Sequence, residues 1–325
     1  FPVDDNSMLA VLDECLASVN GINTIVAGKS IEPRWVTLKQ AKQTLKAGGI
    51  VTWEFASDEN PDIVIVGIGD YVTKESLAAL ALIRKDAPDI RVRFVNMLRL
   101  QAACSCPNDF HEQIPHAEQY FTVDKPVIVN FHGYPEVMQA MITKVKHPER
   151  FSIHGYREEG GTTTPFDMQV RNQTDRYHLA IELLEKIRDT GVMSADQIDS
   201  LITQYKQRLA EHYKYITKHG ADPASVENWQ WSDALSANEK DTAPSFSDIL
   251  SYAKTIAIVG LSEREERHSN RVARYFQTKG YRIIPVNPKL TEVLGEKSYP
   301  ALSEIPKDIH IDIVDIFRRP TEVIT

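Results

Sequence analysis

The sequence has 325 residues, a length that favours two domains, and its 42% hydrophobic and 25% charged residues are typical of a globular protein. Its apolar runs fall short of the roughly 18–20 residues that a membrane span needs, so we expect no membrane segment and no signal peptide. The net charge is −8; residues 251–325 carry 12 Lys or Arg and 10 Asp or Glu, so the acidic excess lies in residues 1–250 and argues against nucleic-acid binding.

Helices and strands alternate in the first 150 residues. Apolar residues at helical spacing predict helices over residues 7–19, 37–45, 73–85 and 135–144, and short β-branched runs predict strands over residues 22–27, 50–55, 63–68, 91–95 and 127–131. The run over residues 63–68 is continuously apolar, as in a strand buried on both faces. This alternation predicts an α/β fold with an open, mostly parallel sheet and flanking helices.

The organisation changes after residue 231. Two helices are predicted over residues 175–188 and 194–219, and the polar, aperiodic residues 232–248 then predict a linker. The linker separates a first domain, residues 1–231, from a second, residues 249–325. In the second domain we expect strands over 255–259, 281–286 and 311–317, with a turn over 260–262 and a helix over 268–279.

Three cysteines, Cys15, Cys104 and Cys106, indicate a reducing, cytoplasmic setting and not a disulfide scaffold. The spacing of Cys104 and Cys106 differs from CxxC, and no second Cys/His pair completes a metal site, so we expect none. The chain begins with Phe1 instead of Met and ends directly after a predicted strand. We therefore expect a fragment of a longer polypeptide.

Two loops of the first domain carry candidate functional residues. The first contains His132, Gly133 and Tyr134, and the second contains His154, Gly155, Tyr156, Thr162, Thr163 and Thr164. The glycines, hydroxyls and proline of the second loop exclude a packed helix, and its hydroxyls and N–H groups could hold an anion or a partner chain. The two histidines could be acid–base groups, but the sequence offers neither a fixed partner, so we expect them to shape loops or interfaces.

Lys29 is the candidate for phosphate binding. It follows a predicted strand and Gly28, and in open α/β sheets the loops after the strands carry the ligand contacts. A flexible ammonium on a glycine turn suits a phosphate.

Residues 1–231 resemble the C-terminal domain of the thiamine-diphosphate-dependent xylulose 5-phosphate/fructose 6-phosphate phosphoketolases. The resemblance rests on residues 25–29, 98–100, 124–127, 132–135 and the threonine-rich loop. That family is similar to transketolase in build, which implies a transketolase C-terminal-like fold. It also implies a homodimer or larger homo-oligomer that cleaves xylulose 5-phosphate or fructose 6-phosphate with inorganic phosphate, giving acetyl phosphate and an aldose phosphate. Lys29 would bind the sugar phosphate.

The resemblance also implies thiamine diphosphate and Mg²⁺, which carry the carbon–carbon cleavage. This chain has no diphosphate-binding motif and no cofactor-activating glutamate. We therefore expect both cofactors to bind in upstream domains, no catalytic residue within this chain, and no activity of the fragment by itself.

Residues 249–325 resemble the small Rossmann-like CoA-binding domains, cut off at the C-terminal end, through residues 256–262, 269–272, 285–288 and 315–318. The resemblance implies a CoA site lined by Gly260, Leu261, Ser262, Ser269, Arg271, Asn287 and Pro288. The glycine would let the backbone approach a diphosphate at the start of the helix, and Arg271 could pair with phosphate. The GxGxxG fingerprint is missing, which disfavours NAD. A Rossmann domain with an empty site is the alternative.

Two other functions stay open. A transketolase-like enzyme is one of them, because a segment that lacks the thiamine site does not separate the two families. A non-catalytic regulatory or assembly segment that senses acyl-CoA would use the second domain alone.

Overall fold

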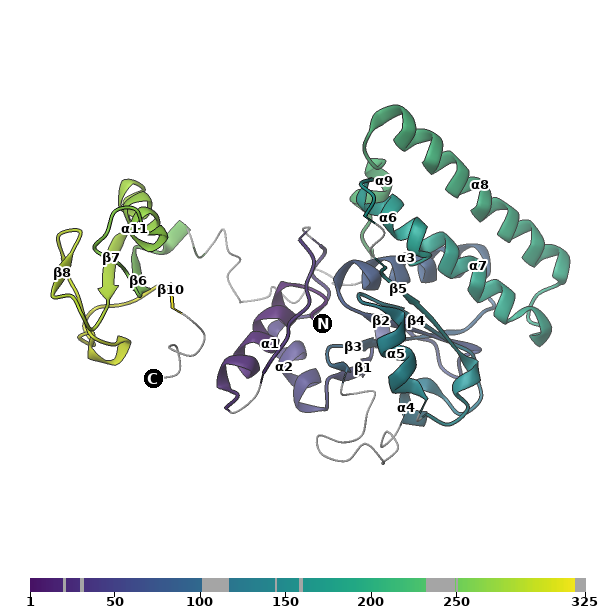
Figure 1. Ribbon diagram of the computed structural model, residues 1–325. Helices are drawn as coiled ribbons and strands as arrows, with labels where there is room; N and C mark the ends of the chain where they lie inside the picture. The colour runs from purple at the N-terminus through teal and green to yellow at the C-terminus, as the bar shows by residue number, and fades with distance from the viewer. Residues whose placement is uncertain are drawn as a thin grey trace. The chain divides into compact units, whose positions relative to one another are not determined.

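The computed structural model describes residues 1–19, 22–29, 32–100, 117–143, 145–157, 160–231, 249 and 251–318. The chain divides into two compact units, Phe1–Lys240 and Asp241–Thr325, each described by itself (Figure 1). The linker predicted over residues 232–248 lies outside the described residues, as do Cys104 and Cys106. No described helix is long and apolar enough to cross a membrane.

The first unit is built on a five-stranded sheet with strand order β1-β3-β2-β4-β5. The strands are β1 (Ile50–Thr52), β2 (Ile63–Ile68), β3 (Val92–Met97), β4 (Val127–Phe131) and β5 (Phe151–Gly155). Edge strand β1 pairs antiparallel with β3, and all other neighbours are parallel. This arrangement confirms the predicted open, mostly parallel sheet.

Helices flank the sheet on both faces (Figure 1). They are α1 (Asp5–Ala17), α2 (Leu38–Lys46), α3 (Asp70–Asp86), α4 (Ala117–Phe121), α5 (Pro135–Ile142), α6 (Pro165–Asn172), α7 (Arg176–Lys186), α8 (Ala195–His219) and α9 (Ala224–Glu227). The 25-residue α8 begins at a capping box formed by Ser194 and Gln197 and ends at Gly220, whose φ of 67° is left-handed. Such caps satisfy backbone groups that the helix cannot pair itself.

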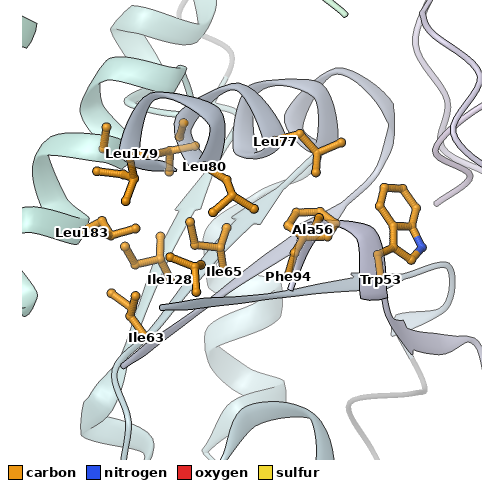
Figure 2. Packing of buried hydrophobic residues seen from close by; sticks show 14 of the residues in the cluster. Trp53, Ala56, Ile63, Ile65, Leu77, Leu80, Phe94, Ile128, Leu179 and Leu183 are labelled. Atoms are coloured by element: carbon orange, nitrogen blue, oxygen red, sulfur yellow. The ribbon is translucent and has the colours of Figure 1, made fainter. Parts of the chain in front are cut away.

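The core has two layers because successive strand residues point to opposite faces. On one face Ile63, Ile65, Phe94 and Ile128 pack against Leu77 and Leu80 of α3 and Leu179 and Leu183 of α7 (Figure 2). On the other face Val64, Val66, Val95 and Val129 pack against Phe121, Met138 and Ile142. Every residue of β2 is buried, which explains the continuous apolar run. Each such Ile or Val contributes roughly 1.5–3 kcal/mol.

The strand predicted over residues 22–27 is wrong. Residues 22–29 form neither a helix nor a strand and do not join the sheet. Ile22 is 98% exposed and only Ile25 packs against the core, so the run buries too little apolar surface to act as a strand. The strand predicted over residues 50–55 is shorter than expected, because residues Glu54–Ala56 form a 3-10 turn.

The second unit contains a three-stranded parallel sheet with order β10-β6-β7. Its elements are β6 (Thr255–Val259), α11 (His268–Thr278), β7 (Arg282–Val286), the hairpin β8 (Glu292–Val293) and β9 (Glu296–Lys297), and β10 (Ile313–Ile316). A core of Ile256, Ile258, Leu261, Ala273 and Ile283 joins the helix to the sheet. The predicted strand–turn–helix–strand order is confirmed.

Candidate functional site

A cavity of about 560 Å³ lies at the carboxyl ends of β2 and β4 in the first unit. Its lining residues come from the segment that contains Lys29 and Glu32, the start of α3, the loops after β4 and β5, and the segments around α6 and α9. They are Ala27, Gly28, Lys29, Glu32, Asp70, Tyr71, Lys74, Glu75, His132, Tyr156, Pro165, Phe166, Met168, Gln169, Asp222, Val226, Glu227 and Asn228. Parallel sheets present ligand sites at this edge.

Lys29 lines this cavity although the predicted strand before it is absent. Its side chain is exposed, and within the described part of the chain it makes no ion pair. The other lysine of the cavity, Lys74, is paired with Glu32 at 2.9 Å and is largely buried. Lys29 is therefore the cation of the lining that remains available to an anionic ligand.

Asp70 connects three parts of the cavity wall. It is the first residue of α3, and its Oδ1 accepts from the Tyr71 N–H at 2.8 Å and lies 2.9 Å from His132 Nδ1. Its Oδ2 accepts from the Gly28 N–H. Burial raises the pKa of Asp70, but His132 and the two backbone N–H groups outweigh this effect and hold its pKa below the ordinary value. Asp70 is thus an ionised carboxylate inside the wall.

Two further carboxylates of the wall are neutralised by buried cations. Glu75 pairs with Arg176 at 2.6 Å, and both side chains are at most 5% exposed. Burial raises the pKa of Glu32, and the neighbouring Lys74 opposes that rise. Pairing is needed because an isolated buried charge is costly. Because these ion pairs neutralise the charges of Glu32 and Glu75, the carboxylates of the wall do not prevent an anion from binding near Lys29.

The neutral polar groups of the cavity include those of Tyr71, Tyr156, Gln169 and Asn228. Burial and the charge of Asp70 raise the pKa of Tyr71, so its hydroxyl stays protonated. Gln169 is 8% exposed, and its Oε1 has no hydrogen-bond partner among the described residues. A hydroxyl-bearing ligand would satisfy such an acceptor.

The two histidines do have fixed partners, contrary to expectation. His132 lies against Asp70, and its ring meets that of Tyr71 edge-on at 4.2 Å. His154 Nε2 is bonded to Glu182. Burial alone would raise the pKa of Glu182. The hydrogen bond and the charge interaction with His154 outweigh burial and lower this pKa to about 2. Neither pair could be predicted from the sequence, because each histidine and its carboxylate partner are 28 or more residues apart.

The two candidate loops meet through their glycines. A Cβ at Gly155 would lie 2.4 Å from the Gly133 carbonyl oxygen and 2.8 Å from Pro135 Cδ. Gly155 thus allows β5 to approach the loop after β4. Tyr134 is 55% exposed beside this contact, and Tyr156 reaches the cavity, whereas His154 does not line it.

The hydroxyls of the threonine-rich loop are mostly used within the chain. Thr163 Oγ1 donates to Asp167 at 2.6 Å, and Thr164 caps α6 and donates to Asp222 at 2.6 Å. Asp222 also accepts from the Phe166 N–H and lies 2.8 Å from His212 Nε2. The loop therefore joins α6 to the end of α8. Thr162 is exposed and, with its two neighbours, lines a separate hollow of about 590 Å³.

In the second unit, hydrogen bonds gather several predicted CoA-site residues. The Ser262 N–H donates to Ser269 Oγ at 3.2 Å, and Asn287 Nδ2 donates to the Leu261 carbonyl at 2.8 Å. The turn after β6, the start of α11 and the end of β7 are thereby held together. Pro288 and Arg271 are exposed, and Arg271 makes no ion pair with any described residue. The Leu261 side chain belongs to the core, so only its backbone can face a ligand.

The sequence analysis missed Asp70, Gln169 and the buried pair of Glu75 with Arg176. A signal for Asp70 existed, because it follows Gly69 directly after a buried strand. Gln169 gave no signal, since its burial depends on segments distant in sequence. Among the described residues, no group of three or more His, Cys, Asp or Glu side chains could hold a metal ion.

Comparison with known proteins gives two family matches. Residues 29–231 match the model of the XFP C-terminal domain, and residues 254–325 match that of the CoA binding domain. Proteins named probable phosphoketolase from Brucella abortus (strain 2308) and Pseudomonas putida (strain F1) are 39% identical over 237 residues and 38% identical over 244 residues. These matches confirm both resemblances noted in the sequence.

The alignments cover 71% and 73% of this chain but 29% and 30% of the two relatives, so the chain spans about three tenths of their length. Among solved structures, a hypothetical protein from Pyrococcus horikoshii OT3 is 42% identical, with 25% of this chain and 60% of that chain covered and a TM-score of 0.22. A transketolase from Pichia stipitis is 14% identical, with 60% and 26% covered and a TM-score of 0.40.

Proposed function

The chain belongs to the family of the XFP C-terminal domain, and on this premise we propose that its first unit is the C-terminal part of a phosphoketolase. The complete enzyme would cleave xylulose 5-phosphate or fructose 6-phosphate with inorganic phosphate. The products would be acetyl phosphate, a shorter aldose phosphate and water. The relatives named probable phosphoketolase support this proposal for the whole protein, of which this chain would supply the substrate-phosphate contact.

The position of Lys29 is the observation that carries the proposal. It lines a cavity at the ligand-binding edge of a parallel sheet, and it is unpaired among the described residues while Lys74 and Arg176 are neutralised. An unpaired ammonium at such an edge suits the phosphate of a sugar phosphate. The uncommitted acceptor of Gln169 and the hydroxyl of Tyr71 would suit the hydroxyls of the sugar.

Thiamine diphosphate and Mg²⁺ enter the proposal as cofactors of the complete enzyme, where they would supply the stabilisation of the carbanion formed on carbon–carbon cleavage. The described residues do not fit them. They offer no cluster of three or more metal-ligating side chains. We therefore assign both cofactors to other parts of the complete enzyme and expect residues 1–325 to be inactive alone. The residues of this chain would bind and orient the phosphorylated substrate.

A chimera tests the function. The matching 237-residue segment of the Brucella abortus relative would be replaced by the corresponding residues of this chain. Acetyl phosphate formation from xylulose 5-phosphate and inorganic phosphate by the purified chimera, together with none from residues 1–325, is the expected result. A folded chimera that forms no acetyl phosphate but transfers a two-carbon unit to an aldose phosphate would favour the transketolase-like alternative.

For the second unit we propose binding of CoA or a short acyl-CoA. No described side chain caps the start of α11, which lies against the Gly260–Ser262 turn, so its N–H groups would suit a diphosphate. Calorimetry of residues 1–325 with CoA and with NAD tests this assignment. Tighter binding of NAD, or no binding of CoA at millimolar concentration, would leave a Rossmann-like unit with another role. If CoA binds but the chimera is inactive, an acyl-CoA-sensing regulatory segment would be the favoured function.

The complete enzyme would also have a compartment and an oligomeric state. We place it in the cytoplasm as a homodimer or larger homo-oligomer, because its substrates are phosphorylated metabolites and the three cysteines suit a reducing compartment. Light scattering of the active chimera would measure the oligomeric state.

A further inference from the structure

The loop that carries Lys29 is attached to the sheet through the residue before it. The Gly28 N–H donates to Asp70 Oδ2, and Asp70 begins α3 directly after β2 and Gly69. The two residues are 42 positions apart in sequence. Lys29 therefore follows a backbone atom that is fixed at the carboxyl edge of the sheet, although its own segment belongs to no strand.

Gly28 has to be a glycine for this contact to form. A Cβ at this position would lie 2.6 Å from Asp70 Oδ2, a separation that real Cβ atoms do not show. The backbone of Gly28 is not left-handed, so the requirement comes from the carboxylate and not from the φ angle. The sequence Gly28-Lys29 thus combines a contact to Asp70 with a free ammonium at the next residue.

Asp70 is itself held in place from two other directions. Its Oδ1 accepts from the Tyr71 N–H at 2.8 Å. The same oxygen lies 2.9 Å from Nδ1 of His132, a residue that directly follows β4. The first turn of a helix also favours a carboxylate, because the unpaired N–H groups there carry partial positive charge. Asp70 is 8% exposed, so water does not compete strongly for its oxygens.

We propose that Asp70 is the positioning residue of Lys29: its carboxylate fixes the Gly28 backbone and thereby holds the Lys29 ammonium at the cavity. Asp70 would not touch the ligand. The inference rests on the proposed phosphate-binding role of Lys29. It adds that Asp70 keeps the Lys29 ammonium at a fixed position in the cavity. A preorganised cation binds its ligand better because less loop entropy is lost on binding.

The variant Asp70→Asn keeps the side-chain volume but removes the negative charge and one acceptor oxygen. Loss of a negative charge near an anionic ligand would by itself lower the KM, so a rise in KM would report the lost positioning and not the lost charge. Both oxygens of Asp70 accept hydrogen bonds, one from Gly28 and the other from the Tyr71 and His132 side. An asparagine has a single acceptor oxygen, so it cannot serve both sides. The matched control is Asp58→Asn, because Asp58 also accepts a backbone N–H, that of Val92 at 2.9 Å, but at another part of the unit.

The first measurement needs no activity and uses residues 1–325. Amide hydrogen exchange over residues 25–29 should be faster in Asp70→Asn than in the unmodified chain, by about 2- to 10-fold if one neutral-strength hydrogen bond is lost. Exchange over the same residues should be unchanged in Asp58→Asn. Equal exchange in all three proteins, or equal acceleration in both variants, would overturn the inference.

The second measurement uses the active chimera. Asp70→Asn should raise the KM for xylulose 5-phosphate about 2- to 10-fold with kcat unchanged, and it should add nothing in a Lys29→Ala background, because Asp70 acts through Lys29. The same rise in both backgrounds would show that Asp70 acts independently of Lys29. If Lys29→Ala leaves KM unchanged, the phosphate role of Lys29 fails, and hydrogen exchange alone then decides whether Asp70 fixes the loop.

Discussion

Gly260 and Phe317 are in direct backbone contact at the carboxyl end of the second unit's sheet. Gly260 has a φ of +84°, and a Cβ there would lie 2.5 Å from the Phe317 carbonyl oxygen. The Phe317 N–H donates to the Val259 carbonyl at 2.8 Å, which continues the pairing of β10 with β6. Gly260 therefore allows the backbone of residue 317 to lie directly against the end of β6.

This contact makes Gly260 a stability residue. We expect Gly260→Ala to destabilise the second unit through two effects, about 1–2 kcal/mol for the left-handed backbone and about 1–3 kcal/mol for the clash with Phe317. Gly280→Ala is the control, since Gly280 has a φ of +88° and no described atom lies within 4 Å of a Cβ there, so it should show the first effect alone. Denaturant-dependent hydrogen exchange over residues 255–259 measures both. Equal destabilisation by Gly260→Ala and Gly280→Ala would show that the clash with the Phe317 carbonyl adds no free-energy cost.

Arg271 is the better variant for testing CoA binding, because it is exposed and its loss should not disturb the fold. We expect Arg271→Ala to weaken CoA binding by about 2- to 5-fold, the value of a solvent-exposed charge pair, and to reduce the salt dependence of binding. Arg274→Ala is the control, since Arg274 already pairs with Glu265 and Asn270. Calorimetry at two salt concentrations decides. A larger loss in the control would place the phosphates elsewhere.

Local patterns predicted most of the fold. The β-branched runs of β2, β4 and β6 were found within a residue of their bounds, because burial on both faces leaves an unbroken apolar signature. The capping box of α8 was equally visible, since Ser194 and Gln197 are three residues apart. Such features depend on neighbours in sequence, which a reader of one sequence can see.

The errors concern contacts between distant segments. The run over residues 22–27 has the composition of a strand, but in the described part of the chain it pairs with no strand and lies outside the sheet. Lys29 nevertheless lines the cavity at the carboxyl edge of the sheet, where the Gly28 N–H is bonded to Asp70. The pairs of His132 with Asp70 and of His154 with Glu182 could not be predicted, since only the parallel sheet brings them together.

The pair of His154 and Glu182 should make the stability of the first unit depend on acid pH. The pKa of Glu182 is about 2 in the folded chain against an ordinary 4.5. Because the unfolded chain binds this proton more readily, the stabilisation is complete above about pH 4.5 and is lost as the pH falls towards 2. The shift corresponds to at most about 3 kcal/mol, which the 19% exposure of the side chain reduces.

Thermal unfolding between pH 5 and pH 2 tests this dependence, with pH values chosen around those two pKa limits. Glu182→Gln should lower the stability at pH 5 and flatten the fall below it. Glu136→Gln is the control, because Glu136 pairs with Arg157 at a 59% exposed surface position, and a surface ion pair contributes little to stability. Parallel curves for the unmodified chain and Glu182→Gln would mean that the pair with His154 does not stabilise the fold.

Lys29 gives the most direct prediction about function. In the active chimera, Lys29→Ala should raise the KM for xylulose 5-phosphate about 10- to 150-fold, since a charge-assisted contact contributes roughly 1.5–3 kcal/mol. The kcat should stay nearly constant, because a contact to the phosphate, far from the reacting carbons, binds substrate and transition state alike. Lys42→Ala is the control, as Lys42 is a surface lysine paired with Asp13. A fall in kcat at unchanged KM would assign Lys29 to the chemical step, and an unchanged KM and kcat would remove it from the site.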